Sequence, residues 1–429
     1  MLYLNKNKEA LRRRNTGGVL SIFFISTILL FWFFPTKIAL APERQVELGN
    51  EMFVKNFSSE LQGKSLGLVI NHTSVLPPGR PLFQALLDKG QKIQAIFSPE
   101  HGFSGKVEAG KEVKDSQLKD IMIYSLYEKN KRPTPEQTYG IDAFVYDIQD
   151  VGTRFYTYIT TLKYVLEAAA EAQIPVYVLD RPNPAGGDII EGPLLRPEYE
   201  SFIGALPIPV RYGLTPGELA MMMKGEGWVP KEFDLHVVRM KNWKRSYFWE
   251  DTGLPWIPPS PNMPTPETAI IYPGSSVLGT VKLNEGRGTP HPFLQFGAPW
   301  LDPSLLIKKL NGGEQFGIKL EAVNYTPRSL PGKALHPLYK NKECHGIRVR
   351  ILQKEKFFSL RFSYEIIKAL KNQQQHKLTT PSGYLNKIFG SNHLSDYIEG
   401  KISYEELISQ VEQEEKSFRE KRQKYLLYK

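Results

Sequence analysis

The stretch AFVYDIQDVGTRFYTYITTLKYVLEAAAEAQIPVYVLD, residues 143–180, decides the fold class. It begins with a short apolar run at 143–146 and ends with another at 176–179, and both runs are typical of buried strands. Residues 158–172 between them carry apolar side chains at helical spacing, namely Ile159, Leu162, Val165, Leu166 and Ala169. The order strand, helix, strand predicts a β-α-β unit with parallel strands.

Apolar runs and helical stretches alternate on the N-terminal side of this unit as well. Residues 66–70, 93–97 and 121–126 are typical of strands, and residues 82–87 carry the apolar face of a helix. Because strands separated by helices usually pair in parallel, we predict an α/β fold. It consists of a Rossmann-like parallel sheet domain followed by a second, smaller α+β domain.

Prolines crowd residues 255–273, and they predict an irregular crossing loop or domain junction without helix or central strand. Before this junction, Thr-Pro-Gly-Glu at 215–218 predicts a helix start in which Glu218 closes a capping box. After it, residues 346–352 are strand-like, and residues 363–370 and 404–428 are helical. We predict three parts: 1–41, a signal peptide or membrane anchor; 42–272, a Rossmann-like catalytic domain; and 273–429, a C-terminal α+β domain that completes a cleft.

Composition excludes several classes of protein. Cys344 is the one cysteine, so an intramolecular disulfide and a cysteine-based zinc site are ruled out. The formal net charge is +10, but no basic block interleaved with aromatic residues favours nucleic acid as a partner. The chain has no Gly-x-Gly-x-x-Gly after a strand, no phosphate-binding loop and no Gly-x-Ser-x-Gly elbow. We therefore expect no nucleotide cofactor and no serine nucleophile.

The N-terminus has the pattern of an export signal. Three arginines at 12–14 precede an uncharged apolar run at 19–34, and Ala39-Leu40-Ala41 has the small-x-small form of a cleavage site. Pro42 follows directly and disfavours cleavage. We predict a periplasmic or extracellular protein. Two outcomes stay open for the segment, removal or retention as a membrane anchor.

Polar clusters follow four of the predicted strands. They are Asn71-His72, Glu100-His101, Asp147 with Asp150, and Asp180-Arg181. The carboxyl ends of parallel strands lie at one edge of a sheet, where ligands bind in open α/β folds. We therefore expect Asn71, Glu100, Asp147 and Asp180 to surround one cleft. The reaction in this cleft would use carboxylate side chains, or a metal ion bound by histidine and carboxylate.

Glycoside cleavage requires an acid that protonates the leaving oxygen, and usually a second carboxylate. Glu100, beside His101, is the candidate acid. Asp147, Glu191 and Glu285 are equal candidates for the second group. A 2-acetamido substrate could instead supply its own nucleophile.

Arginines in glycine- and proline-rich loops are candidate substrate ligands, because a guanidinium binds a carboxylate in bidentate fashion. Arg154, Arg181 or Arg287 could bind a carboxylate of the substrate, although Arg181 could equally pair with Asp180. The full set of candidate substrate-binding residues is Asn71, His72, Asp150, Arg154, Tyr156, Asp180, Arg181, Asn183, Asn262 and Arg287.

At these positions the sequence resembles the exo-β-N-acetylmuramidase family. The matching motifs are Gly67-Leu68-Val69-Ile70-Asn71-His72-Thr73, Ser98-Pro99-Glu100-His101-Gly102-Phe103, Asp147 to Tyr156, Asp180-Arg181-Pro182-Asn183-Pro184, Glu191-Gly192-Pro193, Tyr212 to Glu218, Pro259 to Thr265, Gly286-Arg287-Gly288-Thr289 and the closing Tyr425-Leu426-Leu427-Tyr428. The resemblance implies a Rossmann-like domain, a smaller C-terminal domain and an active site between them. It also implies cofactor-free release of N-acetylmuramic acid from the non-reducing ends of peptidoglycan fragments in cell-wall turnover or recycling, with Glu100 as candidate acid.

The sequence departs from the family at one place. Members often have Glu-Gly-Thr-Asn shortly before Gly-Arg-Gly-Thr, whereas this chain has Leu278-Gly279-Thr280 followed by Val281 to Glu285. The first acid is missing and the spacing changes, which puts a role of Glu285 in question.

Two other functions compete with a glycosidase. One is a metal-dependent hydrolase that uses His72, His101, Asp147 and Asp150. The other is a cell-wall binding protein without catalysis, in which Glu100 only forms a hydrogen bond to a sugar.

Overall fold

The computed structural model describes residues 46–57, 61–127, 129–229, 231–374, 378 and 383–429. The segment for which the sequence predicts export, residues 1–41, lies outside these ranges. The described residues form one compact unit. No helix in the described ranges has both the length and the apolar character needed to span a membrane.

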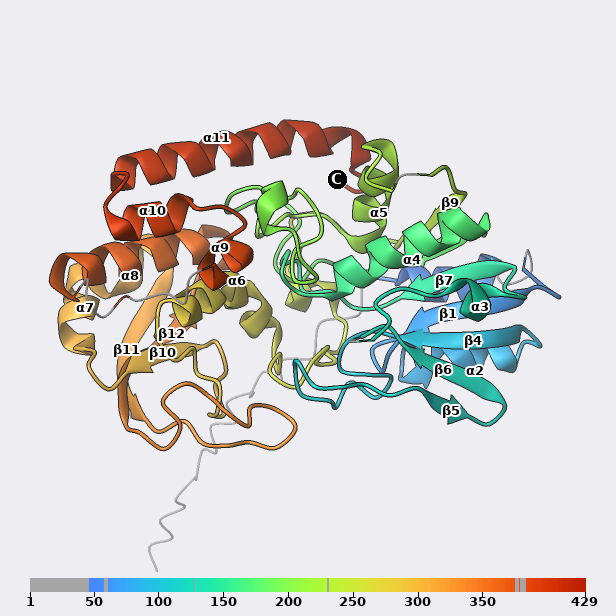
Figure 1. Cartoon of the computed structure of the whole chain (residues 1–429), viewed down its shortest axis with the longest axis horizontal. Coiled ribbons are helices and arrows are strands. Elements are labelled where there is room, and N and C mark those ends of the chain that lie inside the picture. Colours follow the sequence, from blue (N-terminus) through green and yellow to red (C-terminus); the bar gives the residue numbers. More distant parts are fainter. Residues whose placement is uncertain (1–45, 58–60, 128, 230, 375–377, 379–382) are drawn as a thin grey trace, which may run out of the picture. The chain divides into compact units, whose positions relative to one another are not determined.

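A seven-stranded sheet forms the N-terminal half (Figure 1). All its neighbouring strands pair in parallel except for the antiparallel edge pair β5–β6. The strands in spatial order are β5 (Ser116–Leu118), β6 (Ile121–Ser125), β4 (Lys92–Ser98), β1 (Ser65–Ile70), β7 (Ala143–Asp147), β8 (Val176–Leu179) and β9 (Leu235–Val238). The predicted parallel α/β sheet is confirmed.

The chain order shows where the direction of winding reverses. From β1 the chain moves outward to β4 and then β6, and it returns to the other side of β1 as β7, followed by β8 and β9. Leu68 in the middle of β1 lies beside Ile96 of β4 and Val145 of β7. The sheet is thus doubly wound, and its switch point lies between β1 and β7.

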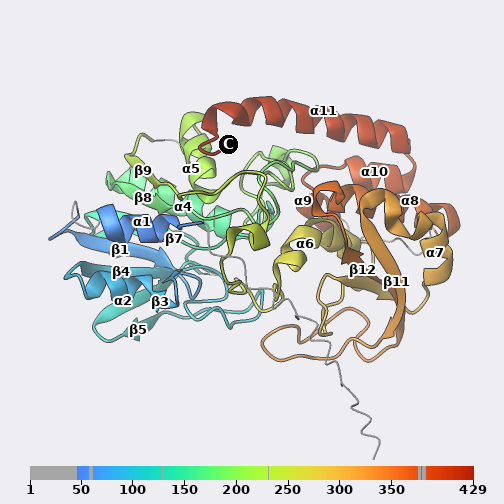
Figure 2. The same cartoon turned by 180° about the vertical axis from the view of Figure 1, so that it is seen from behind.

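Successive side chains of a strand point to opposite faces of the sheet, and both faces are covered. Val69, Phe97 and Phe144 pack with α4 (Tyr158–Ala172) and α5 (Pro216–Gly225). Leu68, Ile96 and Val145 pack on the other face, where α1 (Gly49–Met52) and α2 (Leu82–Leu87) lie (Figure 2). Three short elements lie in loops: α3 (Pro135–Thr138), β2 (Val75–Leu76) and β3 (Arg80–Pro81).

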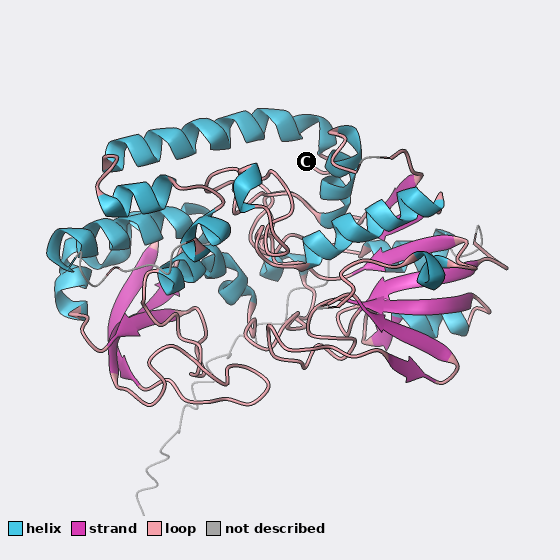
Figure 3. Ribbon diagram, viewed as in Figure 1, coloured by secondary structure: helices cyan, strands magenta, loops and turns pink. Residues whose placement is uncertain are grey.

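The C-terminal part combines a small antiparallel sheet with helices (Figure 3). Its three strands lie in the order β10 (Gln295–Ala298), β12 (Cys344–Ile351) and β11 (Ile318–Tyr325). Its helices are α6 (Pro266–Thr280), α7 (Pro303–Lys309), α8 (Ser359–Gln374), α9 (Tyr384–Phe389), α10 (His393–Glu399) and α11 (Tyr404–Arg422). One buried apolar cluster runs from α4 to α8 and β12, so both parts share a core.

The prediction that residues 255–273 contain no helix is wrong for their second half, because α6 starts at Pro266 and includes Pro273. Pro266 occupies the first turn, where its missing N–H has no helical partner to lose, and the Thr265 side chain caps the helix at Thr268 N. The predicted domain boundary at 272 falls inside this helix and stays a prediction.

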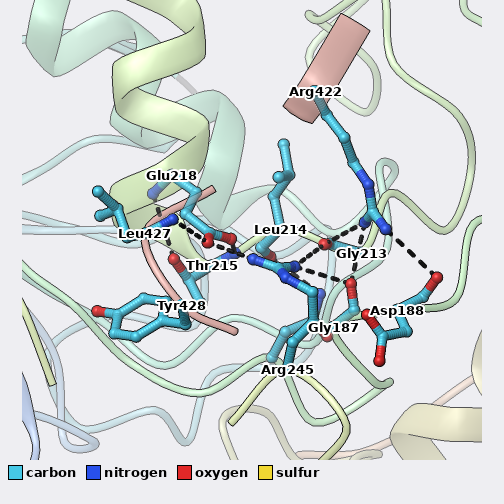
Figure 4. A network of polar contacts seen from close by, with 12 residues as sticks. Gly187, Asp188, Gly213, Leu214, Thr215, Glu218, Arg245, Arg422, Leu427 and Tyr428 are labelled. Carbon is cyan, nitrogen blue, oxygen red and sulfur yellow. Dashed lines mark hydrogen bonds and ion pairs between the residues drawn. The ribbon is translucent and has the colours of Figure 1, made fainter. Parts of the chain in front are cut away.

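The C-terminal tail is hydrogen-bonded to the loops that contain Gly187 and Gly213 and to the start of α5 (Figure 4). Arg422 and Arg245 both donate to the carbonyls of Gly187 and Gly213. The Glu218 side chain accepts a hydrogen bond from Thr215 N and closes the predicted capping box at the start of α5. It also accepts a hydrogen bond from Leu427 N at 2.8 Å. The tail therefore joins the end of the chain to the start of α5.

Candidate active site

A cavity of about 380 Å³ lies between the loops that follow the parallel strands and the start of the C-terminal part. Its lining is polar at several points and otherwise aromatic or apolar, which is the usual composition of a small-molecule site. The lining residues are Glu100, His101, Ala109, Gly110, Tyr127, Phe155, Tyr156, Thr157, Ile203, Ser260, Asn262, Met263, Tyr272, Ser276, Gly279, Glu285, Arg287, Phe293, Tyr384 and Ile388.

Glu100 follows β4, and its side chain is only 9% exposed. Oε2 accepts a hydrogen bond from Thr157 Oγ1 at 2.6 Å, and Oε1 accepts one from Gly110 N at 3.0 Å. Thr157 directly precedes α4, and Gly110 belongs to the polar loop after β4. Two separate loops thus fix the carboxyl group inside the cavity.

His101 lies beside Glu100 in a left-handed backbone conformation, with φ of 72°. Its Nδ1 lies 2.6 Å from Val107 O. A carbonyl can only accept, so Nδ1 carries the proton and Nε2 of the neutral ring is an acceptor. Burial lowers the pKa of His101, and the nearby charge of Glu100 opposes that shift only in part.

The opposite wall of the cavity comes from the loop after α6 and contains Glu285 and Arg287. Arg287 Nε lies 3.0 Å from Glu285 Oε1, and the guanidinium lies 5.2 Å from the centre of the Phe293 ring. Gly279 makes room for this pair, because a Cβ at that position would lie 3.3 Å from Glu285 Oε2. Among the described lining residues, Glu100 and Glu285 are the carboxylates and Arg287 is the arginine.

Aromatic side chains complete the cavity. Tyr156 packs edge-on against Tyr158 and Tyr272, with ring centres 4.8 and 6.0 Å apart. Tyr384 is 52% exposed at the rim. Asn262 also lines the cavity, and its Nδ2 donates to Lys333 O at 2.8 Å. The predicted residues Glu100, His101, Tyr156, Asn262 and Arg287 thus meet at one site.

The shared cleft expected for all four strand ends does not form. Asp147 is fully buried and paired with Arg181, whose Nε lies 2.5 Å from Oδ1. Asp150 accepts from Gly152 N and Tyr212 OH, and burial raises its pKa to about 6. Asp180 accepts from Thr215, Gly217 and Tyr428, and burial raises its pKa to about 7. These carboxylates bind neighbouring loops and do not line the cavity that contains Glu100.

Other predicted residues also have partners within the protein. Glu191 pairs with Arg211 at 3.0 Å and accepts from the N–H groups of Ser359 and Leu360 at the start of α8. Arg154 is fully buried and donates to the carbonyls of Pro193, Ile208 and Ile388, and burial lowers its pKa to about 9. The geometry gives neither side chain access to a substrate.

Asn71, His72 and Asn183 have similar local roles. Asn71 Oδ1 accepts from Thr73, and Asn183 Nδ2 donates to Leu214 O at 2.9 Å. His72 Nε2 lies 2.8 Å from Pro258 O, and burial lowers its pKa. These residues fix the loops that surround the cavity rather than line it.

The alternative metal site does not assemble in the described part of the chain. No group of three or more His, Cys, Asp or Glu side chains there could hold a metal ion. Its four candidate ligands instead bind Pro258, Val107, Arg181 and Tyr212.

Several residues that line the cavity were not predicted from the sequence. Thr157 could have been singled out from the sequence, because a threonine that directly precedes a long predicted helix is a candidate N-cap residue. Gly110, Tyr272 and Tyr384 had none, because only the tertiary structure brings them to Glu100.

Comparisons with known proteins point to one family. Residues 66–267 match the family model described as exo-beta-N-acetylmuramidase NamZ, N-terminal, and residues 270–428 match its C-terminal counterpart. The peptidoglycan beta-N-acetylmuramidase NamZ of Bacillus subtilis (strain 168) is 38% identical over 397 residues, which cover 92% of this chain and 94% of that protein.

Two solved structures are similar to this chain over most of its length. Two DUF1343 family proteins from Bacteroides fragilis NCTC 9343 are each 32% identical, with TM-scores of 0.83 and 0.73. Each match covers 90% of this chain, and 100% and 99% of the other chain. The chain therefore belongs to the NamZ exo-β-N-acetylmuramidase family.

Proposed function

We propose that this protein is a cofactor-free glycosidase, an exo-β-N-acetylmuramidase that releases N-acetylmuramic acid from the non-reducing ends of peptidoglycan glycans during cell-wall turnover. The observation that carries the proposal is the Glu100 carboxyl group, held inside an aromatic-lined cavity by Thr157 and Gly110. Membership of the NamZ family supports the substrate.

Glu100 acts as the general acid. It donates a proton to the glycosidic oxygen as the bond to the anomeric carbon breaks. The hydrogen bonds from Thr157 and Gly110 prevent the side chain from rotating, so that the acid needs little reorganisation in the transition state.

Glu285 is the second carboxylate of the site. It lines the same cavity as Glu100, whereas Asp147 and Glu191 are enclosed in ion pairs elsewhere. Arg287 contacts its Oε1 and limits its orientations. Glu285 then stabilises the positive charge that develops at the anomeric carbon, or orients the 2-acetamido group that attacks it.

Arg287 recognises the lactyl carboxylate of muramic acid. Its Nε lies 3.0 Å from Glu285 Oε1, and no described residue accepts a hydrogen bond from its terminal nitrogens. Those nitrogens are therefore available for a bidentate contact with a substrate carboxylate.

The glycosidase proposal is tested with chromogenic N-acetylmuramide substrates and Glu100→Gln. We expect the rate constant kcat to fall by roughly 10²–10⁴-fold, because general acid catalysis is lost. Binding of a non-hydrolysable muramide should persist, since the amide still accepts from Thr157. The exposed Glu112, changed to Gln, is the matched control and should retain activity. A wild-type protein that binds the muramide without turnover would support the binding-protein alternative instead.

Arg287→Gln tests substrate recognition. The wild-type enzyme should cleave the N-acetylmuramide and not the matching N-acetylglucosaminide. In the variant, kcat/KM for the muramide should fall by roughly 10–100-fold, the effect of losing one charged hydrogen-bonded contact. Equal cleavage of both sugars by the wild type would contradict the specificity.

The protein acts outside the cytoplasm. The three arginines at 12–14 and the apolar run at 19–34 support export, and Pro42 favours retention of the segment as a membrane anchor. Fractionation of cells that produce the tagged full chain is the test. Recovery in the cytoplasm alone would contradict export, and recovery of a shortened soluble form outside the cytoplasm would contradict anchoring.

A further inference from the structure

A second cavity, of about 230 Å³, shares no lining residue with the one that contains Glu100. Its walls are mostly apolar. They consist of Leu48, Thr73, Val75, Pro77, Pro78, Gly79, Gln149, Arg181, Trp249, Leu254, Pro255 and Ile257.

The second cavity lies at the switch point of the sheet. Thr73 and Val75 follow β1, Gln149 follows β7 and Arg181 follows β8. The winding direction reverses between β1 and β7, and doubly wound sheets bind ligands beyond the strand ends at this place. The proposed muramidase site does not use this crevice.

Arg181 gives the cavity an unused group of hydrogen-bond donors. The side chain is 3% exposed, and its Nε is bound to Asp147. In the described part of the chain no oxygen accepts from Nη1 or Nη2. Buried donors without an acceptor are unfavourable, so a bound molecule that supplies one is stabilised.

Gln149 adds an acceptor beside these donors. Its Nε2 donates to Asp150 O at 2.8 Å and Pro182 O at 2.9 Å, and these two bonds fix the orientation of the amide. Its Oε1 is buried without a donor among the described residues. A matching ligand has an acceptor for Arg181 and an O–H or N–H for Gln149.

The remaining walls require an apolar group. Trp249 presents only ring surface, because its Nε1–H donates to Leu254 O at 3.0 Å. The volume exceeds the ~150 Å³ of an apolar protein cavity that binds benzene. A branched aliphatic or aromatic side chain therefore fits.

We propose that this switch-point cavity binds a small carboxylate with a hydrogen-bond donor on the neighbouring carbon and an apolar side chain. A 2-hydroxy acid and an N-acylated amino acid share this chemistry. The carboxylate contacts the terminal nitrogens of Arg181, the adjacent O–H or N–H donates to Gln149 Oε1, and the side chain packs on Trp249 and Ile257.

Calorimetric titration of the full chain with 2-hydroxy-4-methylpentanoate tests the proposal, and it does not depend on glycosidase activity. Wild-type protein should bind this probe, while lactate, which lacks the apolar body, and the corresponding primary amide, which lacks the charge, should bind at least tenfold more weakly. No binding by the wild type, or equal binding of acid and amide, overturns the proposal whether or not muramides are cleaved.

Two variants locate the binding. Ile257→Trp fills the cavity at a half-buried position, and Arg181→Met removes the donors; each should weaken binding at least tenfold. If Arg181→Met unfolds because Asp147 loses its partner, Ile257→Trp decides the question. The exposed Leu338, changed to Trp, is the control and should bind like the wild type. Unchanged affinity in a folded Ile257→Trp protein overturns the location.

Discussion

At the scale of single residues, Thr157 holds the candidate acid in place. It occupies the N-cap position of α4, yet its side chain makes no capping hydrogen bond to that helix. Its hydroxyl instead donates to Glu100 at 2.6 Å. A residue type that normally stabilises a helix end is thus used to position the acid.

Thr157→Val should separate positioning from packing, because valine has nearly the same shape without the hydroxyl. We expect kcat for an N-acetylmuramide to fall roughly fivefold with little change in KM, since one hydrogen bond contributes on the order of 1 kcal/mol. Thr157→Ser should restore the rate. Thermal unfolding of each variant shows whether stability accounts for any loss.

Thr160→Val is the matched control, because the Thr160 hydroxyl is buried on the same helix without a hydrogen bond to any described residue. Its kcat should equal that of the wild type. A Thr157→Val enzyme with unchanged kcat would show that Glu100 does not depend on this contact.

The site could be predicted only in part, for reasons visible in particular residues. Glu100 and His101 were found because they follow an apolar strand. Asp147 and Asp180 follow strands in the same way, yet their carboxyl groups bind Arg181 and Thr215. A sequence gives the position of a residue at a strand end, but not the direction of its side chain or the nearest donor.

At the scale of elements, the pattern of apolar residues predicted the bounds of a helix or strand best where that element is completely buried. The bounds predicted for α4 and β8 match the structure, because nearly every residue that faces the core there is apolar. β9 was missed, since Leu235, His236 and Val237 are only half-buried at the edge of the sheet. α6 was missed because its two prolines argue against a helix.

Helix α11 carries a carboxyl group whose titration should affect stability. Glu415 accepts from Gly192 N at 2.8 Å, and burial raises its pKa to about 7. The folded protein therefore keeps this proton to a higher pH than the unfolded chain. The associated stabilisation is fully present below about pH 4.3 and is lost as the pH rises to about 7, by up to roughly 3 kcal/mol.

Glu415→Gln should remove this dependence. We expect the free energy of unfolding, measured in urea between pH 4.5 and about 7.5, to change less with pH in the variant than in the wild type. Glu405→Gln, at an exposed position of the same helix, should keep the wild-type slope. If the free energy of unfolding changes equally with pH in all three proteins, titratable groups other than Glu415 cause the pH dependence.

At the scale of the whole molecule, the parallel sheet and the C-terminal part depend on each other. One apolar cluster contains side chains of α4, α8 and β12. The last residues reach back to the sheet, where Tyr428 OH donates to Asp180 and Leu427 N donates to Glu218. Neither part is therefore expected to fold alone.

Removal of residues 426–429 tests this dependence. It deletes the contacts of Leu427 and Tyr428, as well as the hydrogen bond from Arg245 N to Lys429 O. The Tyr428 hydroxyl also accepts a hydrogen bond from Met240 N. Each of the four hydrogen bonds contributes about 1 kcal/mol, so the free energy of unfolding should fall by roughly 4 kcal/mol. Activity and the melting temperature should fall together, and Tyr428→Phe, which removes two of these hydrogen bonds, should have about half of the effect. A truncated protein of wild-type stability would contradict the role of the tail.

The two walls of the cavity have a consequence for how the enzyme is made. Glu285 follows Glu100 by 185 residues in the sequence, and the hydrogen bond between Leu427 and Glu218 joins residues that are 209 positions apart. A nascent polypeptide that ends before Glu285 thus contains the candidate acid but not the opposite wall of the cavity. We expect glycan hydrolysis only from a polypeptide that contains both walls of the cavity, so a partly synthesised copy should not cleave peptidoglycan.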